Sequence, residues 1–584
     1  TTFLNKFQNI FDHCFPLTKC DVNDKIRPRK PWMTPGLVKS CRRKQRLYMR
    51  FIKRPTDTNK KKYTYYRNKL NKILHKAEQG YYFEKFAAYR TDIKHTWNII
   101  KQVINKTNQD DISDRFIIDG NSVTDKTIIA NKLNDYFVNI GPSLAAKIPN
   151  ITTSYASFLG KNYKNSFVVC PTTQEEIIST ANKILPKHSA GFDSIPTDIL
   201  KLSVTLIANP LANIINQSFS SGIFPDLLKI AKIRPVFKGG DKCDFTNYRP
   251  ISVLPSFSKI FEKLMYDRLI SYISKYSVLY KNQHGFRSNH STVMAIIEMT
   301  EKITLALDQK QFAIGVFVDL SKAFDTLDHQ ILLKKLEHYG IRGIALNWFQ
   351  SYLSNRKQYV DYCDTNSSYA KIRCGVPQGS ILGPLLFLIY INDLANASKM
   401  LQLILFADDT NIFLAHPNLS ELMQILNNEL SVLNNWFLTN KLSINLKKTH
   451  FILFTHRQRK VDSEKLSVII NNTPITKVAY IKFLGVVIDE YLTWNFHINL
   501  VESKISKTIG ILTKLKRTFP RLILVMIYNS LILPYLDYCT MVWVNGKNAT
   551  SLQKIVTLQK RAVRIISGIH YREHSAPSFK NLTC

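Results

Sequence analysis

The pattern of apolar and polar positions changes along this chain. Through its middle, short apolar runs typical of strands alternate with amphipathic stretches typical of helices. The strand-like runs are residues 230–237, 312–318, 403–406 and 411–414, and the helical stretches include 258–276 and 329–339. Because short apolar strands and helices are mixed in this way, the pattern predicts an α+β fold.

Helical periodicity dominates on both sides of this mixed region. Past residue 497 one apolar stripe recurs at steps of three or four residues, at Ile498, Val501, Ile505, Ile509, Leu512 and Leu515. A chain of 584 residues is also too long for one compact core. We therefore expect a helical extension with a linker at 1–125, helical segments at 126–229, a mixed core at 230–490 and a helical segment at 491–584.

The charge of the chain points to a polyanionic partner. Lysine and arginine number 80 against 43 acidic residues, which gives a formal net charge of +37. Residues 1–100 hold 24 of these cations and only 7 acidic residues. Nucleic acid or an anionic membrane would neutralise such a surface. The longest apolar runs, such as 381–391, are too short to span a membrane, so we expect nucleic acid and no membrane partner.

The basic first hundred residues support two interpretations. Aromatic residues such as Tyr48, Phe51 and Tyr63 stand among the cations. They could stack on bases between phosphate contacts, as an arm that grips a nucleic-acid backbone. An amphipathic helix that buries its aromatic side chains fits the same spacing equally well.

The cysteines and the start of the chain indicate an intracellular protein. Nine cysteines are scattered without the spacing of a zinc site, and no secretory signal opens the chain. Reduced thiols are the simplest interpretation, and we expect the protein in the nucleus and cytoplasm.

Two motifs carry acidic residues at strand ends. In FAIGVFVDLSKAFDTLDH an apolar run ends at Val318 and Asp319 follows it. Taken alone, Asp319 reads more often as a helix N-cap than as a metal ligand. In LILFADDTNIFL two apolar strands flank Asp408 and Asp409, which places both aspartates in a hairpin turn.

Convergence of these carboxylates would create a site for metal-assisted phosphoryl transfer. If the two flanking strands pair beside the Asp319 strand, the three carboxylates meet at one edge of the sheet. Magnesium prefers such hard oxygen ligands, and two ions can activate an attacking hydroxyl and stabilise a leaving oxygen. Spacing alone does not distinguish a polymerase from a phosphatase or a nuclease.

The ordered set of motifs resembles one family. FVDLSKAFDTLDH, GVPQGSILGP and FADD, in this order and with these separations, resemble the motifs of reverse transcriptases from retrotransposons without long terminal repeats, the LINE-like, jockey-related kind. Supporting segments are NYRPISVL, QHGFR, LSINLKKT and IKFLG. The resemblance implies a right-hand polymerase fold with fingers, a palm made of an antiparallel sheet flanked by helices, and a helical thumb. Residues 126–229 would lie on the fingers side, 230–490 would form the fingers and palm, and 491–584 the thumb with a truncated C-terminal segment.

By this resemblance Asp319, Asp408 and Asp409 are the catalytic metal ligands. They would hold two Mg²⁺ ions, with Mn²⁺ as a substitute. Phe324 would lie under the sugar and exclude a 2′-hydroxyl, although packing in a helix core also explains this residue. Gln378, in the tight turn of GVPQGS, would lie near the incoming nucleotide and the template base.

The resemblance also assigns cations and a hairpin. Lys238 and Arg249 resemble residues that clamp the triphosphate, as suits ammonium and guanidinium groups. Lys448 matches a lysine that protonates departing pyrophosphate, and a surface role is equally compatible with it. Arg287 resembles a contact to the template backbone. The hairpin that grips the primer end would comprise Phe483, Leu484 and Gly485.

The resulting hypothesis is an RNA-directed DNA polymerase that uses an RNA template, a DNA primer or target, and deoxynucleoside triphosphates. The family further implies target-primed reverse transcription. No endonuclease pattern precedes these motifs, so we expect a separate or missing endonuclease domain and a fragment of a longer polyprotein. A catalytically silent RNA-binding or assembly protein with the same fold is the alternative, and its mark would be a missing carboxylate. A nuclease or phosphatase is disfavoured because hydrolysis needs neither a sugar gate nor a template grip.

Overall fold

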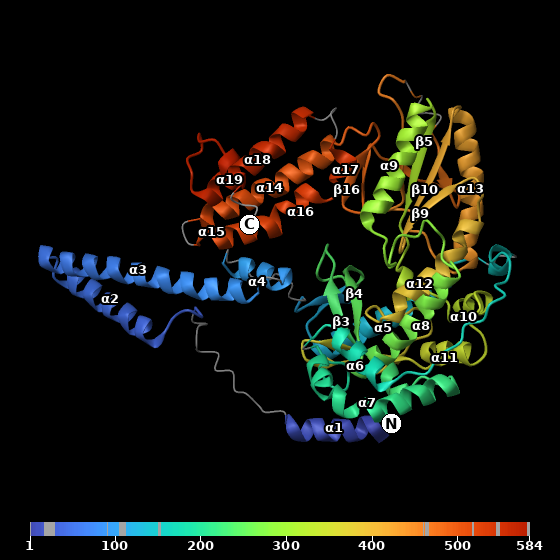
Figure 1. Ribbon diagram of the computed structural model, residues 1–584, viewed down its shortest axis with the longest axis horizontal. Coiled ribbons are helices and arrows are strands. Elements are labelled where there is room, and N and C mark those ends of the chain that lie inside the picture. The colour runs from blue at the N-terminus through green and yellow to red at the C-terminus, as the bar shows by residue number, and fades with distance from the viewer. Residues whose placement is uncertain are drawn as a thin grey trace. The chain divides into compact units, whose positions relative to one another are not determined.

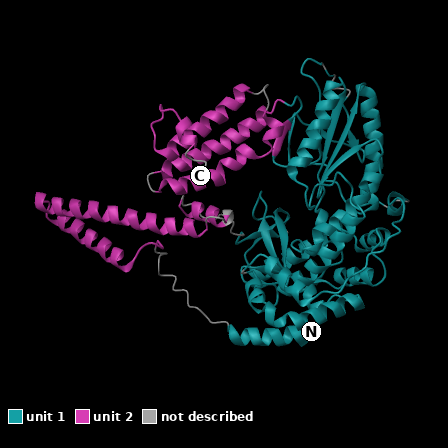
Figure 2. Cartoon of the chain, viewed as in Figure 1, with its two compact units in different colours: residues 1–17, 110–485, 489–492 teal, residues 18–109, 486–488, 493–584 magenta. Residues whose placement is uncertain are grey.

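The structure is a computed structural model, and it divides the chain into two compact units. It describes residues 2–16, 30–89, 92–103, 113–118, 120–149, 153–187, 189–459, 461, 466–516, 519–544 and 549–580. Unit 1 comprises residues 1–17, 110–485 and 489–492, and unit 2 comprises 18–109, 486–488 and 493–584 (Figure 2). Each unit is described by itself below.

A five-stranded sheet, here called the central sheet, lies at one end of unit 1, at the upper right of Figure 1. Its order is β14 (Thr476–Lys477), β11 (His450–Phe454), β5 (Phe312–Val318), β10 (Asp409–His416) and β9 (Gln402–Phe406). Strand β5 is antiparallel to both β10 and β11, and all seven of its residues are buried. These strands confirm the expected strand-like runs and, with the helices, the α+β class.

Helices cover the central sheet and complete its core. Helices α9 (Thr292–Asp308) and α13 (Leu419–Thr439) pack against its strands (Figure 1). Helix α12 (Leu382–Ile391) is almost entirely buried, and it packs against α8 (Ser256–Lys275) and α10 (His329–His338). Burial of this apolar surface is the main stabilising term for the unit.

A buried ion pair joins α10 to the short 3₁₀ turn that follows α12 (Asn392–Asn396). Lys335 on α10 donates to the Asp393 carboxylate at 2.5 Å and to the Tyr390 carbonyl at 2.6 Å, and neither charged side chain is exposed. The indole of Trp436 on α13 donates to the second Asp393 oxygen at 3.2 Å. Because a buried charge needs such partners, this network fixes α10, α12 and α13 relative to one another.

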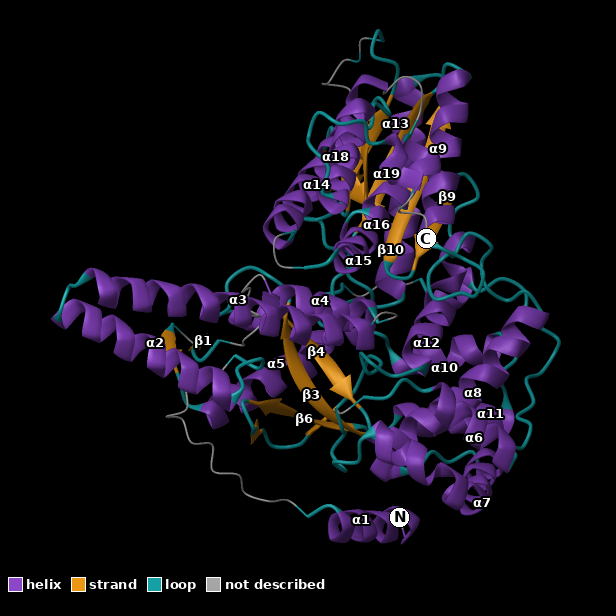
Figure 3. Ribbon diagram, turned by 60° about the vertical axis from the view of Figure 1, so that its left-hand side comes forward, coloured by secondary structure: helices purple, strands orange, loops and turns teal. Residues whose placement is uncertain are grey.

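Unit 1 contains a second sheet, here called the hairpin sheet (Figure 3). Strand β3 (Ile230–Phe237) pairs antiparallel with β4 (Tyr248–Val253) and parallel with β6 (Lys357–Tyr362). Short strands β7 (Thr365–Asn366) and β8 (Ala370–Lys371) pair with β6. Helix α5 (Lys126–Ala145) packs against β6.

The other α-helices and strands of unit 1 lie outside these two sheets and the helices named so far. They are α1 (Thr2–Cys14), β1 (Phe116–Ile118), β2 (Asn121–Val123), α6 (Gln174–Lys183), α7 (Thr197–Ser221), α11 (Gly343–Leu353), β12 (Ile469–Ile470), β13 (Thr473–Pro474) and β15 (Tyr480–Phe483). Helix α7 is long and apolar enough to cross a membrane by length and composition. Its buried face, however, belongs to the core of unit 1.

Unit 2 consists mainly of helices from the two ends of the chain. The first group is α2 (Pro35–Lys53), α3 (Asp57–Ala88) and α4 (Ile93–Val103), and the second is α14 (Asn495–Leu515), α15 (Arg521–Leu531), α16 (Leu533–Asp537), α17 (Thr540–Trp543), α18 (Ala549–Ser567) and α19 (Ala576–Lys580). Strand β16 (Val486–Asp489) contributes three residues to this unit. All six residues of the expected apolar stripe on α14 are buried, which confirms that prediction.

Candidate active site

Three carboxylates come together at one end of the central sheet. Asp319 directly follows β5, and Asp408 and Asp409 lie at the turn between β9 and β10. In the β5–β10 register Thr410 is opposite Val318, so the turn aspartates lie next to Asp319. The expected hairpin is therefore confirmed. The N-cap reading of Asp319 is wrong, because the described chain places Asp328 at the start of α10.

The electrostatics of the two turn aspartates reflect this crowding. Burial raises the pKa of Asp408. The negative charge of Asp319 raises this pKa further, and the positive charges of Arg249 and Lys238 oppose the shift. Burial, together with the negative charges of Asp408 and Asp319, raises the pKa of Asp409 to about 6, although Asp409 keeps contact with solvent. Carboxylates that repel one another in this way are stabilised by a cation.

A buried glutamine holds the turn that carries these aspartates. Ala407 has φ of 56°, in the left-handed region that a residue with a side chain rarely adopts. The side-chain oxygen of Gln283 (Oε1) accepts from the Ala407 backbone amide at 3.1 Å and from the Gly285 backbone amide at 2.9 Å. A Cβ at Gly285 would lie 2.2 Å from the Ala407 nitrogen, so only glycine permits this approach. The QHGFR segment thus stabilises the strained turn.

Asp319 is held by a second segment, LSINLKKT. The Asn445 side chain donates to the Asp319 carboxylate at 3.1 Å, and the Asn445 amide donates to the Asp319 carbonyl at 2.8 Å. The Asp319 amide donates to the Thr449 hydroxyl at 3.3 Å. Sequence reasoning noted this segment for Lys448 and missed the two residues that position Asp319.

The donor set suits a hard divalent cation. Carboxylate oxygens are the ligands that Mg²⁺ takes in proteins, usually one or two of them together with waters and substrate phosphates. Within the described residues no group of three or more Asp, Glu, His or Cys side chains forms a ready-made metal cage. The site therefore fits an ion whose coordination a bound nucleotide would complete.

A group of cations faces the carboxylates from the hairpin sheet. Lys238 follows the end of β3, and Arg249 is paired with Val236 on β4. Burial lowers the pKa of Lys238. The positive charges of Lys448 and Arg249 lower this pKa further, and the negative charges of Asp319 and Asp408 oppose the shift. All three cations that the sequence assigned to the nucleotide therefore lie within electrostatic range of one another.

Lys322 is a fourth cation that sequence reasoning missed. Its backbone has φ of 52°, and its ammonium group donates to the Tyr248 carbonyl at 3.4 Å. Burial is the largest cause that lowers its pKa, Asp325 opposes that shift, and Lys238, Arg249 and Lys448 add to it. The only sequence signal was its position inside the Asp319 motif.

Phe324 lies on a short 3₁₀ turn (Ala323–Asp325) close behind Asp319. Its ring packs 4.7 Å from that of Phe387 on α12 and meets Phe286 edge-on at 6.3 Å. The side chain remains partly exposed. Core packing and a gate beside the nucleotide are thus compatible with the same placement, as the sequence left open.

Gln378 lies in a turn that docks on the segment after Asp319. The Val376 amide donates to the Phe324 carbonyl at 2.9 Å, and the Gly375 amide donates to the Leu327 carbonyl at 2.8 Å. The imidazole of His329 bonds the Gly375 carbonyl at 2.7 Å. Gln378 itself donates to Asp325, a partner that sequence reasoning did not foresee.

The remaining assigned residues occupy neighbouring positions of unit 1. Arg287 donates to the carbonyls of Tyr280 and Gln283 at 2.9 and 3.1 Å, so its guanidinium braces the segment that holds the aspartate turn. Phe483 is buried and packs 5.7 Å from Phe317 on β5. Leu484 and Gly485 follow with φ of 44° and 95° and make a tight turn. Their roles toward template and primer stay predictions.

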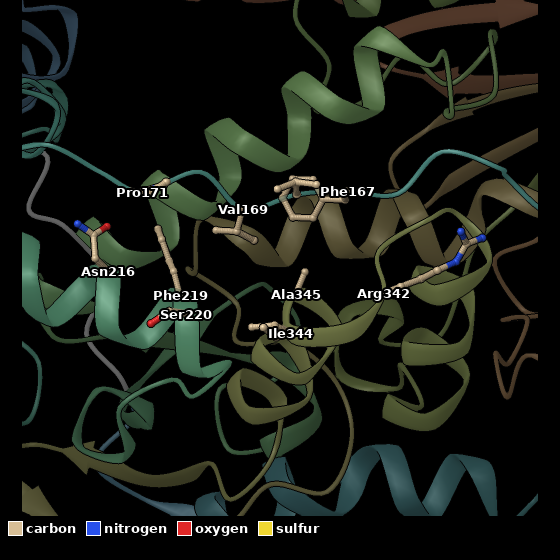
Figure 4. Close-up of a pocket in the computed structure, with 10 residues that line it drawn as sticks. Phe167, Val169, Pro171, Asn216, Phe219, Ser220, Arg342, Ile344 and Ala345 are labelled. Atoms are coloured by element: carbon tan, nitrogen blue, oxygen red, sulfur yellow. The ribbon is translucent and has the colours of Figure 1, made fainter.

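An apolar cavity of about 300 Å³ lies elsewhere in unit 1 (Figure 4). Its lining comes from α7, α11 and the strand-like segment before α6, and it includes Phe167, Phe219 and Ile344. It shares no residue with the carboxylate site.

A sheet end with carboxylates opposite a group of cations is an arrangement that nucleotidyl or phosphoryl transfer can use. The comparison with known families is more specific, because residues 238–488 match the reverse transcriptase (RNA-dependent DNA polymerase) family. This part of the chain is similar to that family, and the resemblance noted in the motifs is confirmed.

Relatives extend the match beyond this domain. The chain is 28% identical over 452 residues to the RNA-directed DNA polymerase from mobile element jockey of Drosophila funebris, which covers 76% of the chain and 48% of the relative. The jockey protein of Drosophila melanogaster is 28% identical over 455 residues, with the same coverage. The Pol polyprotein from type-1 retrotransposable element R1 of Bradysia coprophila is 24% identical over 377 residues, 63% of the chain and 37% of the relative. The chain thus spans about half the length of the jockey proteins.

Proposed function

We propose that this protein is an RNA-directed DNA polymerase of a retrotransposon without long terminal repeats. The observation that carries the proposal is the convergence of Asp319, Asp408 and Asp409 inside a domain of the reverse transcriptase family. The site opposes these carboxylates with cations, as a nucleoside triphosphate requires. All three carboxylates are present, so the catalytically silent alternative lacks its expected mark.

The carboxylates would hold the metal. Reverse transcriptases use divalent ions such as Mg²⁺, and here Asp319 and Asp408 would bind two of them, with Asp409 beside them. A bound ion supplies polarisation of the primer 3′-hydroxyl and of the phosphate oxygens. Asn445 and Thr449 fix Asp319, and Gln283 fixes the turn of Asp408. We expect Mn²⁺ to substitute.

The cations and Phe324 would select and orient the nucleotide. Lys238, Arg249 and Lys448 lie close enough to perturb one another, and a triphosphate would relieve that repulsion. Lys448 is the candidate donor of a proton to departing pyrophosphate. Phe324 would exclude a 2′-hydroxyl by steric conflict.

We assign the parts of a right-hand polymerase to the observed elements. The hairpin sheet with α5–α7 would form the fingers, the central sheet with α9, α12 and α13 the palm, and α14–α19 the thumb. Arg287 would support the template side, and the turn of Phe483, Leu484 and Gly485 the primer end. Phe483 packs on Phe317 of β5, two residues before Asp319, which links that turn to the catalytic strand.

A cationic face of α2 supports nucleic acid as the partner. Arg42, Arg46, Arg50 and Lys53 recur on one side of the helix and line a groove of about 760 Å³. No acidic side chain forms an ion pair with them in the described part of the chain. Evenly spaced, unpaired cations of this kind suit a phosphate backbone.

The wider setting is part of the proposal. We propose that the enzyme copies element RNA from a nicked DNA target, works in the nucleus and cytoplasm without a membrane partner, and acts together with a separate endonuclease domain. The jockey relatives are RNA-directed DNA polymerases of a mobile element by name, which supports the copying of element RNA.

Primer extension tests the proposed activity. The assay uses a poly(rA) template, an oligo(dT) primer, dTTP and Mg²⁺, with wild type and Asp408→Asn compared at equal folded concentration. We expect wild type to extend the primer and the variant to lose at least about 100-fold in rate, because a ligand of the ions is removed. Asp226→Asn is the control, since Asp226 is exposed on the short turn before β3 and an asparagine oxygen can still accept from Lys229. A wild type that binds the template but never extends it would support the silent binding protein.

A further inference from the structure

A carboxylate beside the nucleotide site is bonded to the amide of Gln378. The Gln378 amide nitrogen lies 2.8 Å from each oxygen of the Asp325 carboxylate. Fifty-three residues separate the two side chains in the sequence, yet both adjoin the site, since Asp325 follows Phe324 directly. Asp325 has no role in the activity as derived above.

The backbone around this pair is tightly fixed. A Cβ at Gly375 would lie 2.8 Å from the Asp325 carbonyl, and a Cβ at Gly141 of α5 would lie 2.5 Å from the same oxygen. The Ser252 amide of β4 donates to the Gln378 carbonyl at 2.8 Å. The two side chains therefore meet at a set distance, and the remaining freedom is rotation of the Gln378 amide.

The protonation state of Asp325 decides whether the oxygen or the nitrogen of the Gln378 side-chain amide points away from the Asp325 carboxyl group. An ionised carboxylate only accepts hydrogen bonds, so it must face the side-chain amide nitrogen of Gln378 and leave the side-chain oxygen, Oε1, directed elsewhere. Among the described residues no donor bonds that oxygen. A protonated Asp325 could donate to it, and the amide could then turn over and present its nitrogen instead.

The charged and titratable groups around Asp325 come from three elements. Lys322 lies on its own turn, Tyr136 on α5, and Cys374 in the Gln378 turn, where its thiol donates to the Asp325 carbonyl at 3.5 Å. Burial raises the pKa of Asp325 to about 6, while the bond from Gln378 and the charge of Lys322 oppose that rise. Ionised Asp325 therefore prevails above this pH and the protonated acid below it.

We propose that Asp325 is a positioning residue whose carboxylate turns the Gln378 amide so that its oxygen accepts a hydrogen bond from the incoming nucleotide. This inference rests on the proposed polymerase function and adds a specificity element to it. The effect belongs to nucleotide binding, so KM for the nucleotide should respond while kcat changes little.

Steady-state primer extension between pH 5.5 and 8 tests the inference with wild type, Asp325→Asn and Asp325→Leu. We expect the wild-type KM for dTTP to be nearly constant above about pH 7 and to rise as the pH falls through 6, where the carboxylate becomes protonated. In Asp325→Leu the KM should be about ten times the wild-type value at pH 8, as expected when a charge-assisted hydrogen bond is removed, and the ratio of the two KM values should fall toward one as the wild-type carboxylate is protonated below pH 6. The ratio of the variant KM to the wild-type KM at each pH removes the contribution of other groups that titrate in the assay.

Asn at position 325 can bond either end of the amide and does not titrate. We therefore expect Asp325→Asn to fold like wild type and to show an intermediate KM without the dependence near pH 6. Gln378→Leu should remove the effect of Asp325→Leu, so the double variant should match Gln378→Leu alone.

The outcomes are separable. An active wild type whose KM and pH profile are unchanged by both Asp325 variants overturns the inference and leaves the polymerase intact. A wild type without extension removes the proposed function and this inference together. If Asp325→Leu fails to fold by circular dichroism, Asp325→Asn alone decides, because loss of the pH dependence supports the inference and its persistence overturns it.

Discussion

Phe324 combines a structural contact with a position that can restrict the sugar. Its ring rests on Phe387 at 4.7 Å but stays partly exposed beside the carboxylates. Replacement by alanine should open space for a 2′-hydroxyl, so the preference for dTTP over UTP in kcat/KM should fall by roughly 10- to 100-fold. Single-nucleotide extension with each substrate measures this ratio.

A control at the same cluster separates the gate from its packing. Phe286→Ala removes the edge contact to Phe324 from an exposed ring and should leave the preference within about twofold of wild type. If both variants change the ratio equally, packing of the cluster and not the Phe324 ring sets the sugar preference.

Other residues of the site show where sequence reasoning ends. The three aspartates were predictable because acidic residues at the ends of apolar strands are costly without a partner. Gln283, Asn445 and Asp325 were not, because each acts on a backbone or side-chain group that only the folded chain brings near. Ordinary polar residues give no sequence signal for such contacts.

At the scale of elements, periodicity predicted the strands and helices well, and the α2–α3 hairpin bears on both interpretations of the basic first hundred residues. Tyr48 and Phe51 of α2 contact Tyr63 of α3 with ring centroids 5.3 and 6.5 Å apart. Tyr48 nevertheless stays 38% exposed, and no residue of α2 is buried. Both aromatic packing and contact with nucleic acid therefore remain compatible with this hairpin.

The cationic face of α2 should contribute to binding through its charge. Replacing Arg42, Arg46 and Arg50 with glutamine should weaken binding of an RNA–DNA duplex and reduce the slope of log K against log salt by about 0.9 for each phosphate that the protein no longer neutralises. Fluorescence anisotropy at several salt concentrations measures the slope. The matched variant with lysine at the same three positions keeps the charge, and it should keep the slope. An unchanged slope in the glutamine variant would show that this face does not touch the backbone.

At the scale of the whole molecule, a segment near the start of the chain and the C-terminal segment form one unit. The expected division treated residues 1–125 and 491–584 as separate parts, whereas the structure groups 18–109 with 493–584. Phe519, between α14 and α15, meets Tyr82 and Phe86 of α3 edge-on at 5.9 and 6.1 Å. Periodicity within a helix shows which face is buried but not which distant helix covers it, so the sequence could not give this pairing.

This joint packing predicts that a change near the start of the chain loosens helices near its end. Phe86 is 1% exposed, so Phe86→Ala should cost about 3–5 kcal/mol of local stability. Hydrogen exchange followed by mass spectrometry should show faster exchange in α14 and α15, although more than 400 residues separate them from the substitution. Phe83→Ala is the matched control, because Phe83 lies one turn away on the same helix and is 43% exposed. Faster exchange confined to α3 would mean that the two ends of the chain are stable independently of each other.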